Sequence, residues 1–124
     1  MTREEFIEAV RSNAMDAASI SVMQMLEKPP GKSPNSNLAV LSGWFHELPE
    51  DEREAVAAIV RLAAFSAVFG VLNVIGTAKP TPPGGIPDYS TEGSFELYHV
   101  KYGKRQLINR PAEKPLDDLL KAGS

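Results

Sequence analysis

AVAAIVRLAAFSAVFGVLNVI, at residues 55–75, is the longest apolar stretch of the chain and decides its fold. It contains one charged residue, Arg61, and one amide, Asn73, which we expect to hydrogen-bond where the stretch ends. A proline and three acids stand just before it at residues 49–52, which is typical of a helix start because carboxylates favour the positive end of the helix dipole. The sequence therefore predicts a helix over residues 50–75, buried on most sides, at the centre of the fold.

Small side chains are interspersed with large ones along this predicted helix, and small residues let a neighbouring helix approach closely. If the chain leaves part of the helix uncovered, we expect a second subunit to pack on the ridge formed by Ala63, Ala67 and Gly70. The uncharged stretch 62–78 is at the lower limit of length for crossing a membrane. Acids begin the helix and no pair of basic residues anchors its end, so we expect no membrane partner.

A first helix is predicted over residues 2–27. Thr2, followed three positions later by Glu5, forms the capping box that begins it, and the two prolines at 29–30 end it. Between these limits apolar residues recur at helical spacing. The stripe that we expect to face the core comprises Phe6, Val10, Ala14, Ala17, Ile20 and Met25.

A second, shorter helix is predicted from residue 35 or 36 to residue 47. Gly43 weakens it by about 1 kcal/mol relative to alanine, and the missing side chain would let another backbone come close. Its expected apolar face, which includes the only tryptophan as a core residue, comprises Leu38, Leu41, Trp44, Phe45 and Leu48.

The β structure is predicted in the last third of the chain. Side chains alternate between two faces over residues 94–109, and Gly103 lies in a turn at residues 101–104 where it can adopt a positive φ, so this stretch predicts a β-hairpin. A short helix with leucines on its inner face follows over residues 115–122. We therefore expect an α+β, mostly helical fold in a single domain over residues 1–124: three N-terminal helices around a buried central helix, then a two-stranded β-hairpin and a short C-terminal helix.

Composition argues against several classes of protein. The net charge of −3 disfavours a nucleic-acid binder, which would carry a basic excess to neutralise phosphates. The chain has no cysteine, which excludes a disulfide scaffold, thiolate zinc sites and cysteine nucleophiles. The N-terminal residues lack the apolar run of a signal peptide, so we expect a cytoplasmic protein.

No motif with known catalytic mechanics is present, and the two histidines lie far apart in the sequence. We therefore expect no catalytic residue, no metal and no cofactor. If a small-molecule pocket forms between the central helix, the Pro- and Gly-rich segment 76–93 and the hairpin, its lining is expected to be Asp88, Tyr89, Tyr98 and His99. Aromatic and basic residues of the hairpin resemble a base-stacking surface, but basic residues ordinarily blunt exposed strand edges. No nucleic-acid partner is expected.

The leading hypothesis is a small, non-enzymatic, soluble protein that acts through protein–protein contacts. Such a protein is an accessory, inhibitor or immunity-type protein that binds a protein partner, or it self-associates, for example as a homodimer. Two strands alone are only marginally stable in water, which also favours a neighbour for the hairpin. The alternative is a small-molecule-binding protein or minor enzyme that uses the pocket between the central helix, residues 76–93 and the hairpin.

Overall fold

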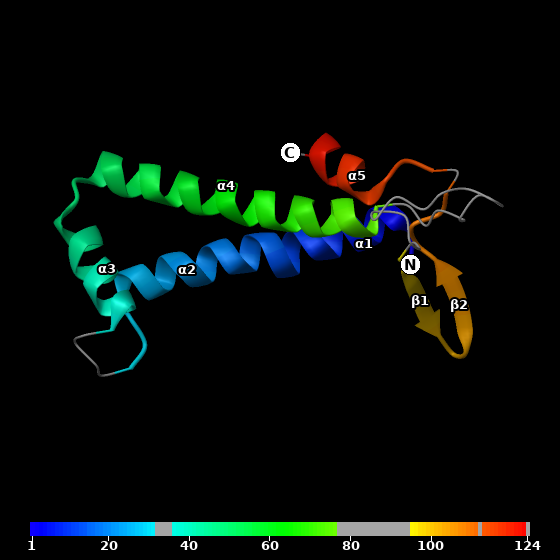
Figure 1. Cartoon of the computed structure of the whole chain (residues 1–124). Helices are drawn as coiled ribbons and strands as arrows, with labels where there is room; N and C mark the ends of the chain where they lie inside the picture. Colours follow the sequence, from blue (N-terminus) through cyan, green and yellow to red (C-terminus); the bar gives the residue numbers. More distant parts are fainter. Residues whose placement is uncertain (32–35, 77–94, 112, 124) are drawn as a thin grey trace, which may run out of the picture. The chain divides into compact units, whose positions relative to one another are not determined.

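The computed structural model describes residues 1–31, 36–76, 95–111 and 113–123. Figure 1 shows the order of the elements. They are α1 (Arg3–Val10), the π-helix η1 (Arg11–Asp16), α2 (Ala17–Glu27), α3 (Asn37–Glu47), α4 (Glu50–Ile75), β1 (Tyr98–Lys101), β2 (Lys104–Leu107) and α5 (Leu116–Ala122). Helices dominate, and a two-stranded antiparallel sheet is followed by a short C-terminal helix, so the predicted α+β, mostly helical class is confirmed.

The chain divides into two compact units. Unit 1 consists of Met1–Arg11 and Ala67–Ser124, and unit 2 consists of Ser12–Ser66. α4 is one continuous helix that contributes its first part to unit 2 and its last turns to unit 1. Each unit buries its own set of side chains.

The predicted helix starts are confirmed by their caps. The Thr2 hydroxyl accepts a hydrogen bond from the Glu5 backbone N–H at 3.0 Å, and the Ser36 hydroxyl accepts one from the Ala39 N–H at 3.1 Å. Both hydroxyls satisfy backbone donors that the first turn of a helix leaves without a partner. The helix over residues 50–75 also has the predicted bounds, with acids in its first turn.

Unit 2 contains α2, α3 and the first part of α4, and in Figure 1 the chain runs out along α2, turns through α3 and returns along α4. Backbone acceptors at the end of α2 hold α3 in place. The Ser42 hydroxyl donates to the Leu26 carbonyl at 2.6 Å, and the His46 Nε2 lies 2.7 Å from the Glu27 carbonyl oxygen. The ring of Phe45 is buried at 3% exposure.

Two residues predicted on the inner face of α3 are not buried. Leu41 and Trp44 are each 50% exposed, whereas the neighbouring Ser42 and Phe45 are buried. The buried face of α3 is therefore narrower than the apolar face that the sequence predicted. A Cβ atom added at Gly43 would meet no atom within 4 Å, so no backbone of the described residues makes the close approach expected there.

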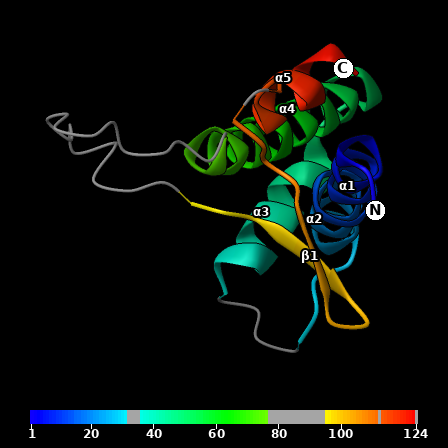
Figure 2. The ribbon, with the colours of Figure 1, turned by 90° about the vertical axis from the view of Figure 1, so that its right-hand side faces the viewer.

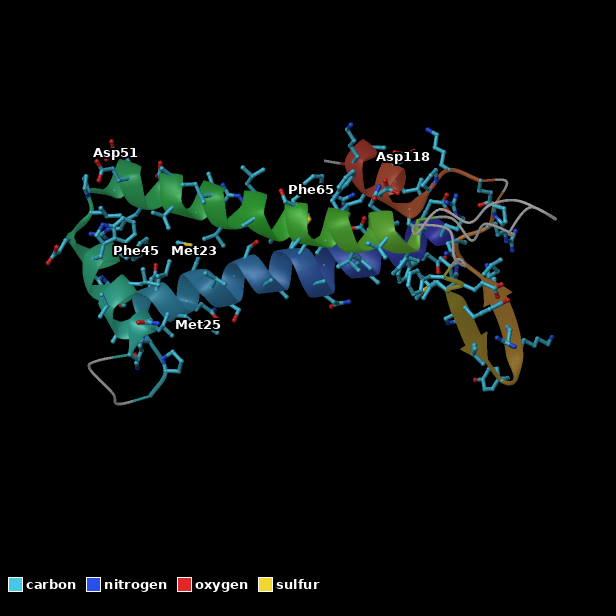
Figure 3. The ribbon with its side chains drawn as sticks, in the orientation of Figure 1. Met23, Met25, Phe45, Asp51, Phe65 and Asp118 are labelled. Atoms are coloured by element: carbon cyan, nitrogen blue, oxygen red, sulfur yellow. The ribbon has the colours of Figure 1, made fainter. Side chains whose placement is uncertain are left out.

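The stripe predicted for the first helix is wrong beyond residue 11. η1 interrupts the helix, and a π-helical turn holds an extra residue, which rotates every later side chain about the axis. Figure 3 shows Met23 pointing from α2 towards α4 and Met25 pointing away. The residues that turn inward along η1 and α2 are Met15, Ser19, Met23 and Leu26, whereas Ala14, Ala17, Ile20 and Met25 are exposed.

Unit 1 packs α1, the last turns of α4, the hairpin and α5 around one apolar cluster. Figures 1 and 2 show α5 beside the end of α4, where the Leu116 N–H donates to the Gly76 carbonyl at 3.5 Å. The predicted inner face of the last helix is confirmed, since Leu116 and Leu120 are completely buried. The buried apolar side chains of unit 1 are Ile7, Leu72, Ile108, Leu116 and Leu120.

Asn109 joins three parts of unit 1 and is itself completely buried. Its Nδ2 donates to the carbonyl oxygens of Ile75 at 3.0 Å and Phe95 at 2.8 Å, and its Oδ1 accepts from the Leu97 N–H at 2.9 Å. The end of α4 and the base of the hairpin are thereby tied by one side chain. Asn73, expected to hydrogen-bond at the end of α4, donates to the Asp117 carboxylate at 3.0 Å.

The hairpin has the predicted turn. Lys101 pairs with Lys104, and the two residues between them both have positive φ, 53° at Tyr102 and 75° at Gly103. Two positive φ values in a two-residue loop define the turn type that matches the twist of antiparallel strands. Glycine adopts this conformation freely, whereas tyrosine does so at a cost.

The predicted burial of the central helix is wrong, although its bounds are right. Leu72 is the one buried side chain along α4. Half-buried residues recur along the helix at helical spacing, namely Val56, Ala57, Val60, Ala64, Phe65, Val68, Phe69 and Ile75. Among the described residues, the other elements therefore cover α4 only in part.

Candidate functional site

Of the four residues predicted to line a pocket, the structure describes Tyr98 and His99, so the pocket stays a prediction. Asp88 and Tyr89 lie outside the part of the chain that the structure describes. Tyr98 and His99 are consecutive residues of β1, so their side chains point to opposite faces of the strand. No shared site for these two side chains results.

Tyr98 is engaged by two residues of the hairpin. Its hydroxyl donates to the Glu96 carboxylate at 2.6 Å, and the Arg105 guanidinium lies 4.2 Å from its ring centroid. The hydrogen bond to Glu96 is the main cause that raises the pKa of the Tyr98 hydroxyl above its ordinary value, and the negative charge of Glu96 adds to it. The positive charge of Arg105 opposes this effect and lowers the pKa. Tyr98, Glu96 and Arg105 together form a small polar cluster on the hairpin.

The tip of the hairpin presents one further aromatic residue. Tyr102 is 92% exposed, and the Lys101 ammonium lies 5.4 Å from its ring centroid. An exposed aromatic ring can stack on a flat group, and a basic residue beside the ring can attract a negative charge on that group. Basic residues on an edge strand also prevent it from pairing with another chain. Among the described residues, no three His, Asp or Glu side chains lie close enough together to hold a metal ion.

Among the described residues, α4 carries an exposed, mainly apolar surface, which we call the outer face of α4. All of its members are exposed, and they recur at helical intervals, so they lie on one side of the helix. The outer face consists of Ile59, Leu62, Ala63, Ser66, Ala67, Gly70 and Val74. Ile59 and Leu62 are each 64% exposed and Val74 is 66% exposed.

The outer face contains no charged residue, but Asn73, three positions after Gly70, lies on the same side of the helix and donates to the Asp117 carboxylate of α5. Charges also stand at the start of the helix. Glu50, Asp51, Glu52 and Glu54 are all exposed, and Figure 3 shows Asp51 at this end. A Cβ atom added at Gly70 would meet nothing within 4 Å, so no described residue packs closely on the surface at this position. Chemically, such a face can bury apolar surface against a second apolar face and can accept a closely packed helix.

Sequence reasoning found part of this surface. The ridge of Ala63, Ala67 and Gly70 was predicted as the place for a second subunit if part of the helix is uncovered. The rest of the helix was predicted to be buried on most sides, so the exposure of Ile59 and Leu62 was not predicted. Burial around a helix depends on how many elements pack against it, and the apolar content of α4 alone does not give that number.

No family model matches the chain, and neither a curated protein nor a solved structure is detectably similar to it.

Proposed function

We propose that this chain is a non-enzymatic protein that acts through protein–protein contacts, and that the outer face of α4 makes them. The observation that carries the proposal is the exposure of Ile59, Leu62 and Val74 along one uncharged side of a long helix. Single exposed apolar side chains are ordinary on protein surfaces, whereas a contiguous apolar face marks an interaction site.

The size of the hydrophobic contribution indicates what kind of partner is needed. Burying the exposed two thirds of one such side chain contributes about 1–2 kcal/mol. The three large residues together contribute about 4 kcal/mol for each chain, whereas association costs about 4–15 kcal/mol in lost freedom of motion. A partner that also offers apolar surface, such as the face of another helix, supplies the difference.

A membrane span is the second candidate, because one observation favours it. By length and composition α4 is the one helix among the described residues that could cross a membrane, and 6% of its most apolar 18-residue window is buried. A core helix of a soluble protein would be mostly buried over the same window. The exposure of α4 therefore needs a partner, which is either lipid or protein.

The packing of unit 1 supports a protein partner over lipid. The last turns of α4 carry the buried Leu72 and the hydrogen bond from Asn73 to Asp117 on α5. Inserting these turns would bring the charged residues of α5 with them, at about 2.5–3.5 kcal/mol for each charge at the membrane centre. The part of α4 within unit 2 that follows the acids, residues 55–66, spans about 18 Å, short of the roughly 30 Å of a hydrocarbon core.

The decisive experiment compares the tagged native chain with the double variant Ile59→Gln/Leu62→Gln, both purified without detergent from the organism's own cells. We expect the native chain to retain a stoichiometric protein partner, either another protein or a second copy, and the double variant to lose it. Circular dichroism should show unchanged helix content, because both side chains are already exposed. Ile20→Gln/Val40→Gln is the matched control, since Ile20 and Val40 are 58% and 63% exposed but lie on α2 and α3.

Two outcomes would contradict the proposal. A native chain that is monomeric by sedimentation and carries no partner leaves the outer face of α4 without a role. Recovery of the native chain only in the membrane fraction, resistant to alkaline extraction, would favour the second candidate instead.

A further inference from the structure

The turn of the hairpin carries a residue that its backbone does not favour. Tyr102 has a φ of 53°, and it is the one residue other than glycine with positive φ in the described part of the chain. Glycine or asparagine adopts this conformation at a lower cost than tyrosine. The ring offsets little of that cost within the chain, because it is 92% exposed. Neither the turn nor the packing of the described residues therefore explains a tyrosine at this position.

Two like charges lie side by side next to this turn. Lys101 is directly opposite Lys104 in the register of the strands, so both side chains lie on one face with Cβ atoms about 4.5–5.5 Å apart. Like charges in directly opposite positions destabilise a pair of strands. The ion pairs of the described residues are those of Arg3, Arg11 and Arg110, so no described carboxylate pairs with either lysine. An anion between the two ammonium groups would remove the repulsion.

The charge around the turn differs from that of the chain as a whole. Residues 100–105 are all exposed, and they contain no acid and three basic residues, which are Lys101, Lys104 and Arg105. The acid nearest in sequence, Glu96, accepts the hydrogen bond from the Tyr98 hydroxyl at 2.6 Å. Composition predicts no nucleic-acid partner because it counts charges over all 124 residues, but physiological salt screens exposed charges beyond about 8 Å. A ligand at the turn therefore meets a positive local charge.

These features fit a ligand that is both flat and anionic. The Tyr102 ring can stack on a flat group, and the Lys101 ammonium, 5.4 Å from the ring centroid, places a positive charge beside it. A nucleotide supplies a flat base next to a phosphate, whereas an acidic protein segment supplies the charge without the flat ring. Bases are free to stack on a protein where they are not paired in a duplex. The exposed turn does not enclose a free nucleotide as a pocket would, which favours a single strand.

We propose that the turn of the hairpin binds single-stranded nucleic acid, with a base stacked on Tyr102 and the adjacent phosphate held between Lys101 and Lys104. The phosphate neutralises the two opposed ammonium groups, and the stacked base covers the exposed ring. Binding tolerates different sequences, because every base has a flat face, and it weakens as salt rises. This inference does not depend on the proposed function, which assigns protein contacts to α4.

Fluorescence anisotropy of a labelled oligouridylate of about 12 nucleotides measures binding to the full native chain. Tyr102→Asn removes the ring while it suits the positive φ of the turn. We expect this variant to raise the dissociation constant at least about fivefold, which corresponds to one lost stacking contact. Its thermal midpoint should stay equal or rise, so the loss of binding cannot come from unfolding. Tyr102→Trp should bind at least as tightly as the native chain.

The role of charge is tested separately. Lys101→Gln/Lys104→Gln should reduce the slope of log Kd against log salt concentration by about 0.7, because one phosphate contact is lost. Lys28→Gln/Lys114→Gln is the matched control, since it removes the same charge from two exposed lysines outside the hairpin. The control should leave the slope unchanged, and an equal reduction by both variants would contradict the phosphate contact.

Other results would overturn the inference as a whole. These are no binding at about 0.1 mM protein, or equal affinity of the native chain and Tyr102→Asn. Displacement of the oligonucleotide by poly-L-glutamate at equal charge would identify an acidic protein segment as the ligand instead. Displacement by uridine monophosphate at equal nucleotide concentration would identify a free nucleotide. Ile59→Gln/Leu62→Gln should bind the oligonucleotide as the native chain does, so the failure of either proposal leaves the other standing.

Discussion

Asn109 shows how much one polar side chain can determine in a small unit. Its three hydrogen bonds satisfy two carbonyl oxygens and one N–H at the junction of α4 and the hairpin. Asn109→Ala should lower the free energy of unfolding by about 2–4 kcal/mol, because it leaves these backbone groups without partners and also opens a cavity. Urea unfolding measures the change. Asn13→Ala is the control, since Asn13 is exposed, and it should change stability by no more than about 0.5 kcal/mol. Equal effects of the two variants would contradict the role given to Asn109.

Tyr98 gives a prediction about pH at the same scale. Its raised pKa means that the folded chain favours the neutral phenol, so the associated stability is present below the unfolded pKa of about 10 and is lost as pH rises through the folded value. Glu96→Gln should bring the pKa of Tyr98 down towards its ordinary value, because it weakens the hydrogen bond that is the main cause of the shift and removes the negative charge that adds to it. Tyrosinate absorbance measures this in a background that carries Tyr89→Phe and Tyr102→Phe. Glu47→Gln on α3 is the control, and a titration that Glu96→Gln leaves unchanged would contradict the assignment.

At the scale of elements, the extra residue of η1 determines which side chains of α2 face inward. Deleting the exposed Asn13 should convert the π-turn to α-helix and keep Met15, Ser19 and Leu26 on the inward side, so the thermal midpoint should stay equal or rise. Inserting an alanine after Asn13 instead should rotate α2 by about 100° and lower the midpoint by several degrees. Thermal denaturation followed by circular dichroism compares the two. A stabilising insertion or a strongly destabilising deletion would show that the extra residue of η1 is needed.

The elements themselves could be predicted because their signals are local. Thr2, Ser36 and the residues before Glu50 fix helix starts through caps and charge, and Gly103 fixes the hairpin turn. The inward faces could not be predicted with the same success. The π-turn leaves no simple mark in the sequence, and the buried Asn109 looks like any polar residue after a strand. On α4, the residues Ala63, Ala67 and Gly70 of the predicted ridge are exposed, whereas the exposure of their large neighbours was not predicted. The contact with a second subunit stays a prediction.

At the scale of the whole molecule, α4 runs without a break through both units, and this continuity should couple their unfolding. Leu116→Ala in unit 1 and Phe45→Ala in unit 2 should each destabilise by about 3–5 kcal/mol, since both side chains are buried. The single tryptophan, Trp44, reports on unit 2, whereas far-ultraviolet circular dichroism reports on all helices. We expect both probes to follow one transition in both variants, as a single domain over residues 1–124 requires. Two separated transitions would identify two domains.

The order of the segments in unit 1 has a consequence for protein synthesis. Unit 2 is one continuous segment, whereas unit 1 joins the first eleven residues, Met1–Arg11, to Ala67–Ser124. The Arg11 guanidinium donates to the Leu120 carbonyl at 3.1 Å across 109 positions of sequence. At a ribosomal rate of about 5–20 residues per second, α1 therefore emerges about 5–20 s before the helix that it contacts. During that interval Ile7 has none of its C-terminal neighbours, so α1 is made before α4 and α5 but is among the last of these helices to be buried.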